Sequence, residues 1–286
     1  MKTKKWRLAL RIGLGMAILA ALAGCAKDRV AAQPVPIAGV PVPEAAAEPQ
    51  GDARALLMRM GDFLSKTPRF TVNIRNNYDV IQASGQEIEF GEVRKLSLNR
   101  PDRLRVEVEQ SDGDRNMILF DGATLTAFDG TQNVFAQAPQ SGGIDGGLKY
   151  FLKDLHMRLP LAMLLVSQLP EELERRTESV DYVEKTALFG LPAHHLAVRN
   201  DTVDYQIWIA EGNQPLPLRV VLTYKNAEGQ PQFRAQLSDW NLAPEITDAT
   251  FAFTPPPGAQ KISFPAQAPQ IDLQGTPALE QTGVKP

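Results

Sequence analysis

The side chains that could carry covalent, metal or acid–base chemistry in this chain are one cysteine, three histidines and 33 acidic residues. A single cysteine excludes an internal disulfide framework and any zinc or iron–sulfur site built from cysteines. His194 and His195 are adjacent, and neighbouring residues of a strand point to opposite faces, so the two imidazoles cannot readily share a metal ion. His156 has no partner at a ligand spacing. We therefore expect neither a metal site nor a cofactor.

Two further segments contain residue types that occur in catalytic sites. The acidic run 171–174 follows Pro170, which is typical of the solvated first turn of a helix rather than of a catalytic carboxylate pair. The glycine-rich run 141–147 lacks the Gly-Lys-Ser/Thr ending that binds phosphate and magnesium, and it predicts either a plain loop or a flexible joint. The sequence contains no serine-hydrolase elbow, zinc-protease helix motif or calcium loop. These patterns favour a protein that binds over an enzyme.

The cysteine ends an N-terminal segment with the pattern of a secretory signal. Five basic residues in positions 1–11 precede the uncharged run 12–24, which is too short to span a bilayer comfortably as a helix but fits the apolar region of a signal peptide. The sequence LAGC at 22–25 resembles the lipobox of bacterial lipoproteins, whose cysteine receives a diacylglycerol and, on its freed amine, a further acyl chain such as palmitate. We predict a lipoprotein signal peptide over 1–24 and lipidation of Cys25. The alternative is an ordinary cysteine that ends a membrane anchor.

The residue after the cysteine and the charge balance indicate where such a protein would be held. Ala26 follows the cysteine, and in a Gram-negative cell the lipobox pattern then implies the outer membrane, facing the periplasm, because the usual retention signal there is aspartate. Without its first 24 residues the chain keeps 25 basic and 33 acidic side chains, a net charge of −8. This charge argues against nucleic-acid binding and against attachment to anionic lipid heads, so the lipid anchor is the expected contact with the membrane.

Proline-rich segments flank the part of the chain that is expected to fold. Residues 25–50 are rich in Pro and Ala, and the fixed φ angles of proline predict an extended tether there. Three prolines at 255–257 close the regular pattern, and 265–286 are predicted to be a disordered tail. Residues 51–264 are therefore expected to form one folded domain.

Within that domain the pattern runs from a helix to strands, then to helices and again to strands. Apolar residues at helical spacing after Asp52, the expected N-cap, predict a helix that ends before Pro68. Alternation over 103–109 and two Asp-Gly pairs in 121–130 predict antiparallel strands joined by tight turns. Helical spacing returns over 144–165, and five more strands are expected over 179–189, 193–199, 203–210, 216–225 and 230–241. Such segregation predicts an α+β fold in which helices cover one face of a curved antiparallel sheet.

Several motifs of this domain occur together in one bacterial family. They are PDRLRVE at 101–107, FDG at 120–122, VDYQIWI at 203–209, PLP at 215–217 and LSDWN at 237–241. In this order they resemble a family of predicted periplasmic proteins of unknown function, itself similar to the lipoprotein carriers LolA and LolB and to the mycobacterial lipid carrier LppX. The resemblance implies an incomplete antiparallel β-barrel with an N-terminal helix and a two-helix lid over an apolar cavity that holds acyl chains. It assigns no carrier's functional residues to this chain, and the lipobox favours the membrane-anchored, LolB-like arrangement.

Apolar side chains of the alternating strands and of the helical segment are expected to line such a cavity. They are Leu104, Val106, Val108, Phe151, Leu152, Leu155, Tyr205, Ile207, Leu218, Val220, Leu222, Phe233 and Leu237. Binding would come mostly from apolar area removed from water, about 25 cal/mol per Å² before ordering costs. The same periodicity fits a filled core, so both interpretations stay open.

Two tryptophans, Trp208 and Trp240, fall in the polar phase of their strands. A pair on the convex face, stacked with Arg219, would form a contact surface for an envelope protein or for the membrane interface. Burial by a bulge or a closing loop is the alternative.

The sequence as a whole predicts one of two functions. The first is a membrane-anchored periplasmic lipoprotein that binds lipid or lipoprotein acyl chains. The second is an envelope structural, sensor or interaction protein with the same fold and no ligand.

Overall fold

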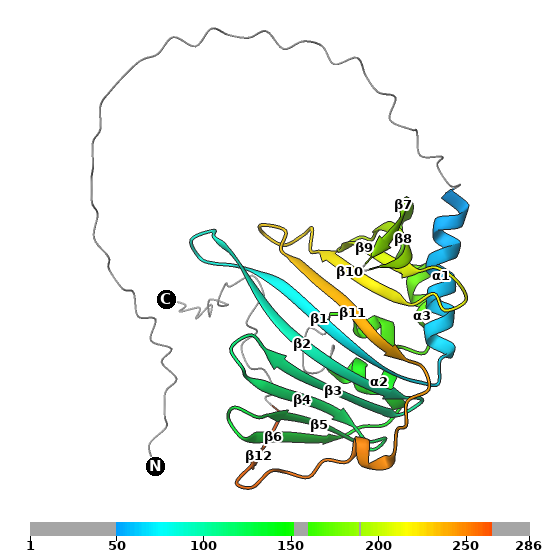
Figure 1. Cartoon of the computed structure of the whole chain (residues 1–286). Coiled ribbons are helices and arrows are strands. Elements are labelled where there is room, and N and C mark those ends of the chain that lie inside the picture. The colour runs from blue at the N-terminus through cyan, green and yellow to red at the C-terminus, as the bar shows by residue number, and fades with distance from the viewer. Residues whose placement is uncertain (1–49, 152–159, 189, 265–286) are drawn as a thin grey trace, which may run out of the picture. The chain divides into compact units, whose positions relative to one another are not determined.

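Twelve strands in the described residues 50–151, 160–188 and 190–264 of the computed structural model pair into one sheet (Figure 1). The strand order is β12-β6-β5-β4-β3-β2-β1-β11-β10-β9-β8-β7. All of these pairs are antiparallel except β12 with β6. The strands are β1 (Arg69–Ile81), β2 (Glu87–Asn99), β3 (Arg103–Gln110), β4 (Arg115–Phe120), β5 (Thr124–Asp129), β6 (Val134–Pro139), β7 (Ser179–Leu188), β8 (Leu191–Arg199), β9 (Asp204–Ala210), β10 (Pro217–Thr223), β11 (Gln232–Asn241) and β12 (Gln260–Ile262).

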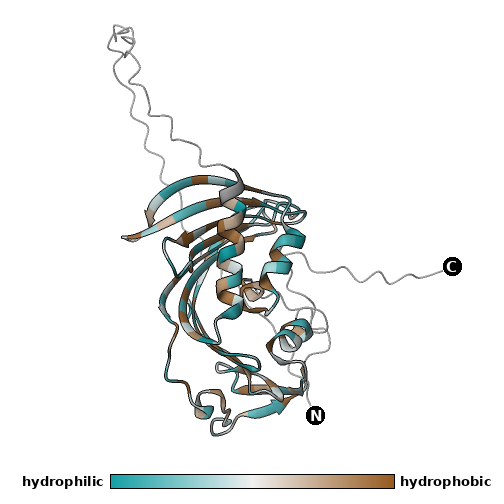
Figure 2. Cartoon of the chain, turned by 90° about the vertical axis from the view of Figure 1, so that its right-hand side faces the viewer, coloured by the Kyte–Doolittle hydropathy of each residue, from teal (hydrophilic) through white to brown (hydrophobic). Residues whose placement is uncertain are grey.

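Helical segments lie on the concave side of this sheet, which Figure 2 shows as an open arc. They are α1 (Gln50–Lys66), α2 (Gly143–Lys149), the 3₁₀ turn η2 (Ala162–Leu165) and α3 (Leu169–Arg176). The sheet does not close on itself, because β12 and β7 remain its two edges. The predicted fold class, an α+β incomplete antiparallel barrel with an N-terminal helix and a helical lid, is confirmed. Within the described ranges, no helix is long and apolar enough to cross a membrane, and no group of side chains is arranged to hold a metal ion.

The N-terminal helix α1 packs one apolar stripe onto the core. Its fully buried side chains repeat at intervals of three and four residues, the spacing of one helix face: Ala53, Leu57, Met60 and Leu64. The helix begins at Gln50, so Asp52 lies in its first turn and the expected N-cap at this residue is wrong by three positions. The predicted end is confirmed, since Pro68 follows and the Thr67 hydroxyl donates to the carbonyl of Phe63 at 2.7 Å.

The two Asp-Gly turns form where the sequence predicts them, between β4 and β5 and between β5 and β6. The Asp121 carboxylate accepts hydrogen bonds from the backbone N–H groups of Ala123 and Thr124 at 3.0 and 2.7 Å. Asp129 binds the two corresponding N–H groups of its own turn. Gly122 has φ +96°, a left-handed conformation that glycine adopts without steric cost. Both turns are therefore specified by local chemistry, which is why the sequence reveals them.

The regular structure of the C-terminal segment, orange in Figure 1, continues beyond the prolines at 255–257, where the sequence predicts that the regular pattern ends. After a 3₁₀ turn, η3 (Asp248–Phe251), the chain adds β12 in parallel to β6. Phe251 packs on Met117 and Leu119, and these three buried residues form a second, smaller hydrophobic cluster on the convex face. A parallel pair between segments more than a hundred residues apart leaves no local signal, so the expected end of the pattern was wrong.

Candidate ligand-binding cavity

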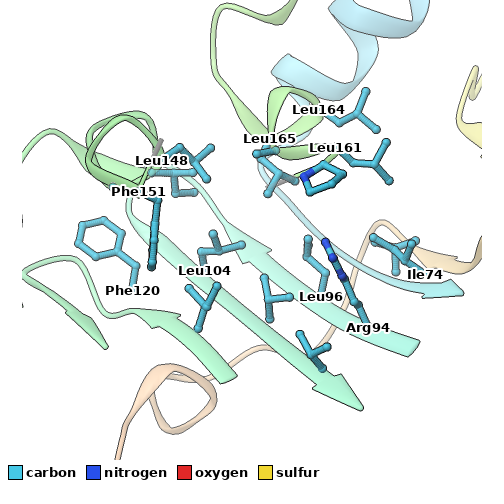
Figure 3. Close-up of a pocket in the computed structure, with 18 of the residues that line it drawn as sticks. Ile74, Arg94, Leu96, Leu104, Phe120, Leu148, Phe151, Leu161, Leu164 and Leu165 are labelled. Carbon is cyan, nitrogen blue, oxygen red and sulfur yellow. The ribbon is translucent and has the colours of Figure 1, made fainter. Parts of the chain in front are cut away.

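An apolar cavity of about 150 Å³, here called the central cavity, lies between the concave face of the sheet and the α2–η2 segment (Figure 3). The strands contribute Phe70, Val72, Ile74, Leu96, Leu104 and Val106. The opposite wall contains Ile144, Leu148, Phe151, Leu161, Leu164 and Leu165. Arg94 is the one charged residue among the described residues of the lining.

The alternation of β3 directs its apolar side chains to the concave face of the sheet. Val106 lines the cavity, whereas Arg105 and Glu107 lie on the opposite face and form an ion pair at 2.7 Å. Arg105 also donates to the carbonyl of Thr250 at 3.1 Å, which ties β3 to the C-terminal segment. One strand thus separates an apolar interior from a charged exterior, because its side chains alternate between the two faces.

Three polar contacts hold the wall opposite the sheet in place. The N–H of Ile144 donates to the carbonyl of Pro101 at 2.9 Å, and a Cβ on Gly143 would lie only 2.7 Å from that carbonyl oxygen. The carboxylate of Asp145 accepts hydrogen bonds from both the backbone N–H and the hydroxyl of Ser167. Arg100 donates to the carbonyl of Leu165 at 2.8 Å. The glycine at position 143 therefore permits a close approach of α2 to the turn between β2 and β3 that a side chain would obstruct.

Two neighbouring cavities adjoin the central one across the segment 160–164. The helix-side cavity, about 170 Å³, lies toward α1 and α3 and shares Leu161 and Leu164 with the central cavity. The polar cavity, about 140 Å³, lies toward the far ends of β1, β2 and β11 and shares Arg94 and Pro160 with it. Leu161 has φ +67°, a left-handed conformation that is a steric outlier for a bulky residue. This strained residue stands between the central and the helix-side cavity.

The tyrosine that lines the helix-side cavity, Tyr205, is uncharged. Burial raises the pKa of Tyr205 to about 12, and the nearby Thr177 hydroxyl and Arg54 offset this effect only in part. The Tyr205 hydroxyl therefore stays protonated at neutral pH. It adds a neutral polar atom to a lining that also includes the apolar residues Leu57 and Met60 and the charged residues Arg176 and Asp201.

The residues expected to line a cavity divide among these three spaces. Leu104, Val106, Val108, Phe151 and Leu237 line the central cavity. Tyr205, Ile207, Val220 and Leu222 line the helix-side cavity, and Phe233 lines the polar cavity. Leu218 is buried but lines none of the three, and Leu152 and Leu155 lie outside the described residues.

Sequence reasoning missed β2 as a source of lining residues, although Leu96 and Arg94 come from this strand. The open end of β2 carries charged residues on both faces, Glu92 and Arg94 on one and Lys95 on the other. An apolar–polar alternation that would mark an inward face is therefore absent from that part of the strand. The segment expected as a second lid helix, 161–165, is instead the single turn η2.

The expected pairing of Trp208 with Trp240 on the convex face is wrong. Trp240 lines the central cavity, with its ring centroid 5.2 Å from that of Phe70. The cause is a bulge in β11, where Asp239 has φ +55° and the register with β1 shifts. A bulge inserts one residue and so moves the following side chain to the other face. Burial by a bulge, the alternative that the sequence leaves open, is therefore what happens at Trp240.

Trp208 does lie on the convex face, in a stack with its neighbours. Its ring is parallel to that of His195 with 4.0 Å between centroids, and the Arg219 guanidinium lies 5.5 Å from the indole. His195 contacts Gln206 at 3.0 Å, whereas His194 contacts Tyr182 at 3.2 Å. The two adjacent histidines therefore point to opposite faces, as expected for neighbours on a strand.

Several solved structures are similar to this chain at low sequence identity. Among solved structures, similar chains include an uncharacterized conserved protein from Thermus thermophilus, with 13% identity over 74% of this chain and 99% of that one and a TM-score of 0.43. The lipoprotein LppX of Mycobacterium tuberculosis has 12% identity over 70% of this chain and 100% of that one, with a TM-score of 0.43. A LolA superfamily protein from Nitrosomonas europaea has 11% identity over 70% and 97%, with a TM-score of 0.38.

A search of curated proteins finds no match. The model of one family, described as "Predicted periplasmic protein (DUF2092)", matches residues 53–265, which is most of the chain. The chain belongs to this DUF2092 family of predicted periplasmic proteins.

Proposed function

We propose that this protein binds the acyl chain of a lipid or of a lipid-modified protein in the central cavity. One observation carries the proposal: a cavity of about 150 Å³ whose described lining is apolar except for Arg94. A ligand that fills the cavity removes its apolar lining from water, which favours binding by about 25 cal/mol per Å² of buried apolar area.

The volumes of the three cavities limit the length of the acyl chain that can enter. An apolar cavity of similar size is known to admit a molecule as large as benzene. A longer acyl chain therefore has to pass Leu161 and Leu164 and extend into the helix-side cavity. The proposed binding site is the central cavity together with this extension, and its proposed function is binding rather than catalysis, because the described lining of the central cavity offers apolar contact and one guanidinium.

The proposal places the protein at a membrane through its N-terminus. Cleavage after the signal peptide at 1–24 and lipidation of Cys25 would anchor it, with 25–50 as a tether to the folded domain 51–264 and with 265–286 as a tail. Two or three acyl chains hold a protein stably, whereas one chain holds it only reversibly. In a Gram-negative host, this chemistry would place the domain in the periplasm at the outer membrane.

The test is to extract the natively purified full-length protein with organic solvent, identify acyl species by mass spectrometry, and titrate the protein with a fluorescent acyl probe. Val106→Trp fills the central cavity, and we expect it to weaken probe binding at least about tenfold without lowering the melting temperature. The matched control, Val183→Trp, places the same side chain at an exposed position of β7 and leaves binding unchanged.

Absence of bound lipid together with equal probe binding by both variants would contradict the proposal. That result would favour the alternative function, an envelope interaction or sensor protein with no ligand.

A further inference from the structure

Arg94 lies at the junction between the central and the polar cavity. Its side chain rises from the concave face of β2 toward the wall that contains Leu161 (Figure 3). It is 19% exposed, and its guanidinium lies 5.9 Å from the centre of the Phe233 ring. A cation at this position would meet whatever group terminates an acyl chain held in the central cavity.

The guanidinium keeps hydrogen-bond donors for such a group. Its Nε donates to Glu92 at 2.5 Å, and Nη2 pairs with the same carboxylate oxygen. Within the described ranges, no acceptor is bound to Nη1. Arginine has five N–H donors, and 19% of the Arg94 side chain is exposed, so an oxygen of a ligand in the cavity could accept a hydrogen bond from its free donors.

The charge at this junction decides which oxygen fits. The charged residues that line the polar cavity are Asp79, Glu92 and Arg94. Asp79 is paired with Arg234 at 2.7 Å, so Glu92 is the carboxylate that faces Arg94. The Glu92 side chain is only 9% exposed and is held in place by Asn76, which donates to it at 3.1 Å. A carboxylate or phosphate would therefore bring a further negative charge next to Glu92. A neutral carbonyl oxygen accepts the same hydrogen bond without this repulsion.

From this geometry we infer that Arg94 and Glu92 form a head-group subsite that selects acyl chains ending in a neutral ester or amide carbonyl over free fatty acids. The inference rests on the proposed function, because it concerns the polar end of a chain bound in the central cavity. Arg94 donates to the carbonyl oxygen. Glu92 orients the guanidinium and repels anions.

The experiment compares a monoacylglycerol with the free fatty acid of the same chain length, each displacing the fluorescent acyl probe from the full-length protein at neutral pH. We expect the wild type to prefer the monoacylglycerol at least about tenfold. Glu92→Gln keeps an acceptor for Arg94 and Asn76 but removes the charge, and it should strengthen fatty-acid binding about tenfold while leaving the ester unchanged. Arg94→Met keeps a stem of similar length and should weaken ester binding.

A matched control is Glu107→Gln, which removes one carboxylate from the convex face of the neighbouring strand β3 and should change neither affinity. Equal wild-type affinities for the two ligands, a preference for the free acid, or an unchanged fatty-acid affinity in Glu92→Gln would overturn the subsite. Failure of the wild type to bind either ligand would instead contradict the proposed function itself, so the two failures are distinguishable.

Discussion

The indole of Trp240 packs against the ring of Phe70 with 5.2 Å between their centroids, and its Nε1 donates to the carbonyl of Pro217 at 3.1 Å. This contact places Trp240 in the wall of the central cavity. Trp208 lies on the other face of the sheet, stacked on His195. The two tryptophans therefore report on opposite sides of one sheet.

Acyl-chain occupancy of the cavity should alter the fluorescence of Trp240 but not that of Trp208. The third tryptophan of the chain, Trp6, lies in the segment predicted to be cleaved, so Trp208→Phe leaves Trp240 as the only emitter of the mature protein. A brominated fatty-acid ester should quench this variant strongly, because bromine quenches at close range. The matched variant Trp240→Phe keeps only Trp208 and should be quenched little. Similar quenching of both variants would mean that the ester binds outside the cavity.

Removal of the Leu161 side chain should let longer acyl chains bind. Leu161 lines both the central and the helix-side cavity, so both Leu161→Gly and Leu161→Ala would connect the two spaces. We expect each variant to shift the preferred ligand to a longer chain in a series of monoacylglycerols. Glycine also relieves the left-handed strain at φ +67°, so Leu161→Gly should be more stable than Leu161→Ala by about 1 kcal/mol. An unchanged preference in both variants would show that Leu161 does not limit chain length.

Asp79 should make the protein's stability depend on acid pH. It is 4% exposed and accepts hydrogen bonds from Arg234 at 2.7 Å and from the N–H of Gln232 at 2.8 Å. Burial alone would raise its pKa, but these hydrogen bonds outweigh burial and hold the pKa below its ordinary value of 3.8. Because the folded-state pKa is the lower one, the stabilisation is complete above the unfolded-state pKa and is lost as the pH falls through the folded-state pKa.

Asp79→Asn should therefore lower the free energy of unfolding by about 2 kcal/mol at neutral pH and make its decline in acid shallower. Urea denaturation at neutral and at acid pH measures both effects. Glu87 is the control, since its hydrogen bond with Asp79 raises its own pKa and its side chain is exposed. Glu87→Gln should leave stability at neutral pH nearly unchanged. If the free energy of unfolding declined in acid equally in the wild type and in Asp79→Asn, the assignment of this decline to Asp79 would be contradicted.

The parts of the fold that the sequence predicts are those encoded by near neighbours. Alternation in β3 separates Val106 from Glu107, and the Asp121 carboxylate binds N–H groups two and three residues ahead. Both signals lie within a few residues of one another, so periodicity and turn chemistry are sufficient to identify them.

The parts that the sequence does not predict depend on partners far along the chain. The inward direction of Trp240 follows from a bulge at Asp239 that exists only in the register between β11 and β1. Arg94 looks like an ordinary surface charge until β2 is placed beside the segment that contains Leu161. The cavity is therefore partly predictable as a set of apolar residues, whereas its polar junction emerges only from the assembled sheet.

Lipidation of Cys25 is a prediction from the sequence that a labelling experiment can decide. In bacteria supplied with radioactive palmitate, the wild-type protein should incorporate label and sediment with the membranes, whereas Cys25→Ala should incorporate no label. The cleaved chain has a net charge of −8 and gains no attraction to anionic lipid heads, so the lipid is its expected contact with the membrane. In a Gram-negative host, Ala26→Asp should keep the label but move the protein from the outer to the inner membrane fraction. Incorporation of label by Cys25→Ala would contradict the prediction, because it would show that the acyl chain is attached at another residue.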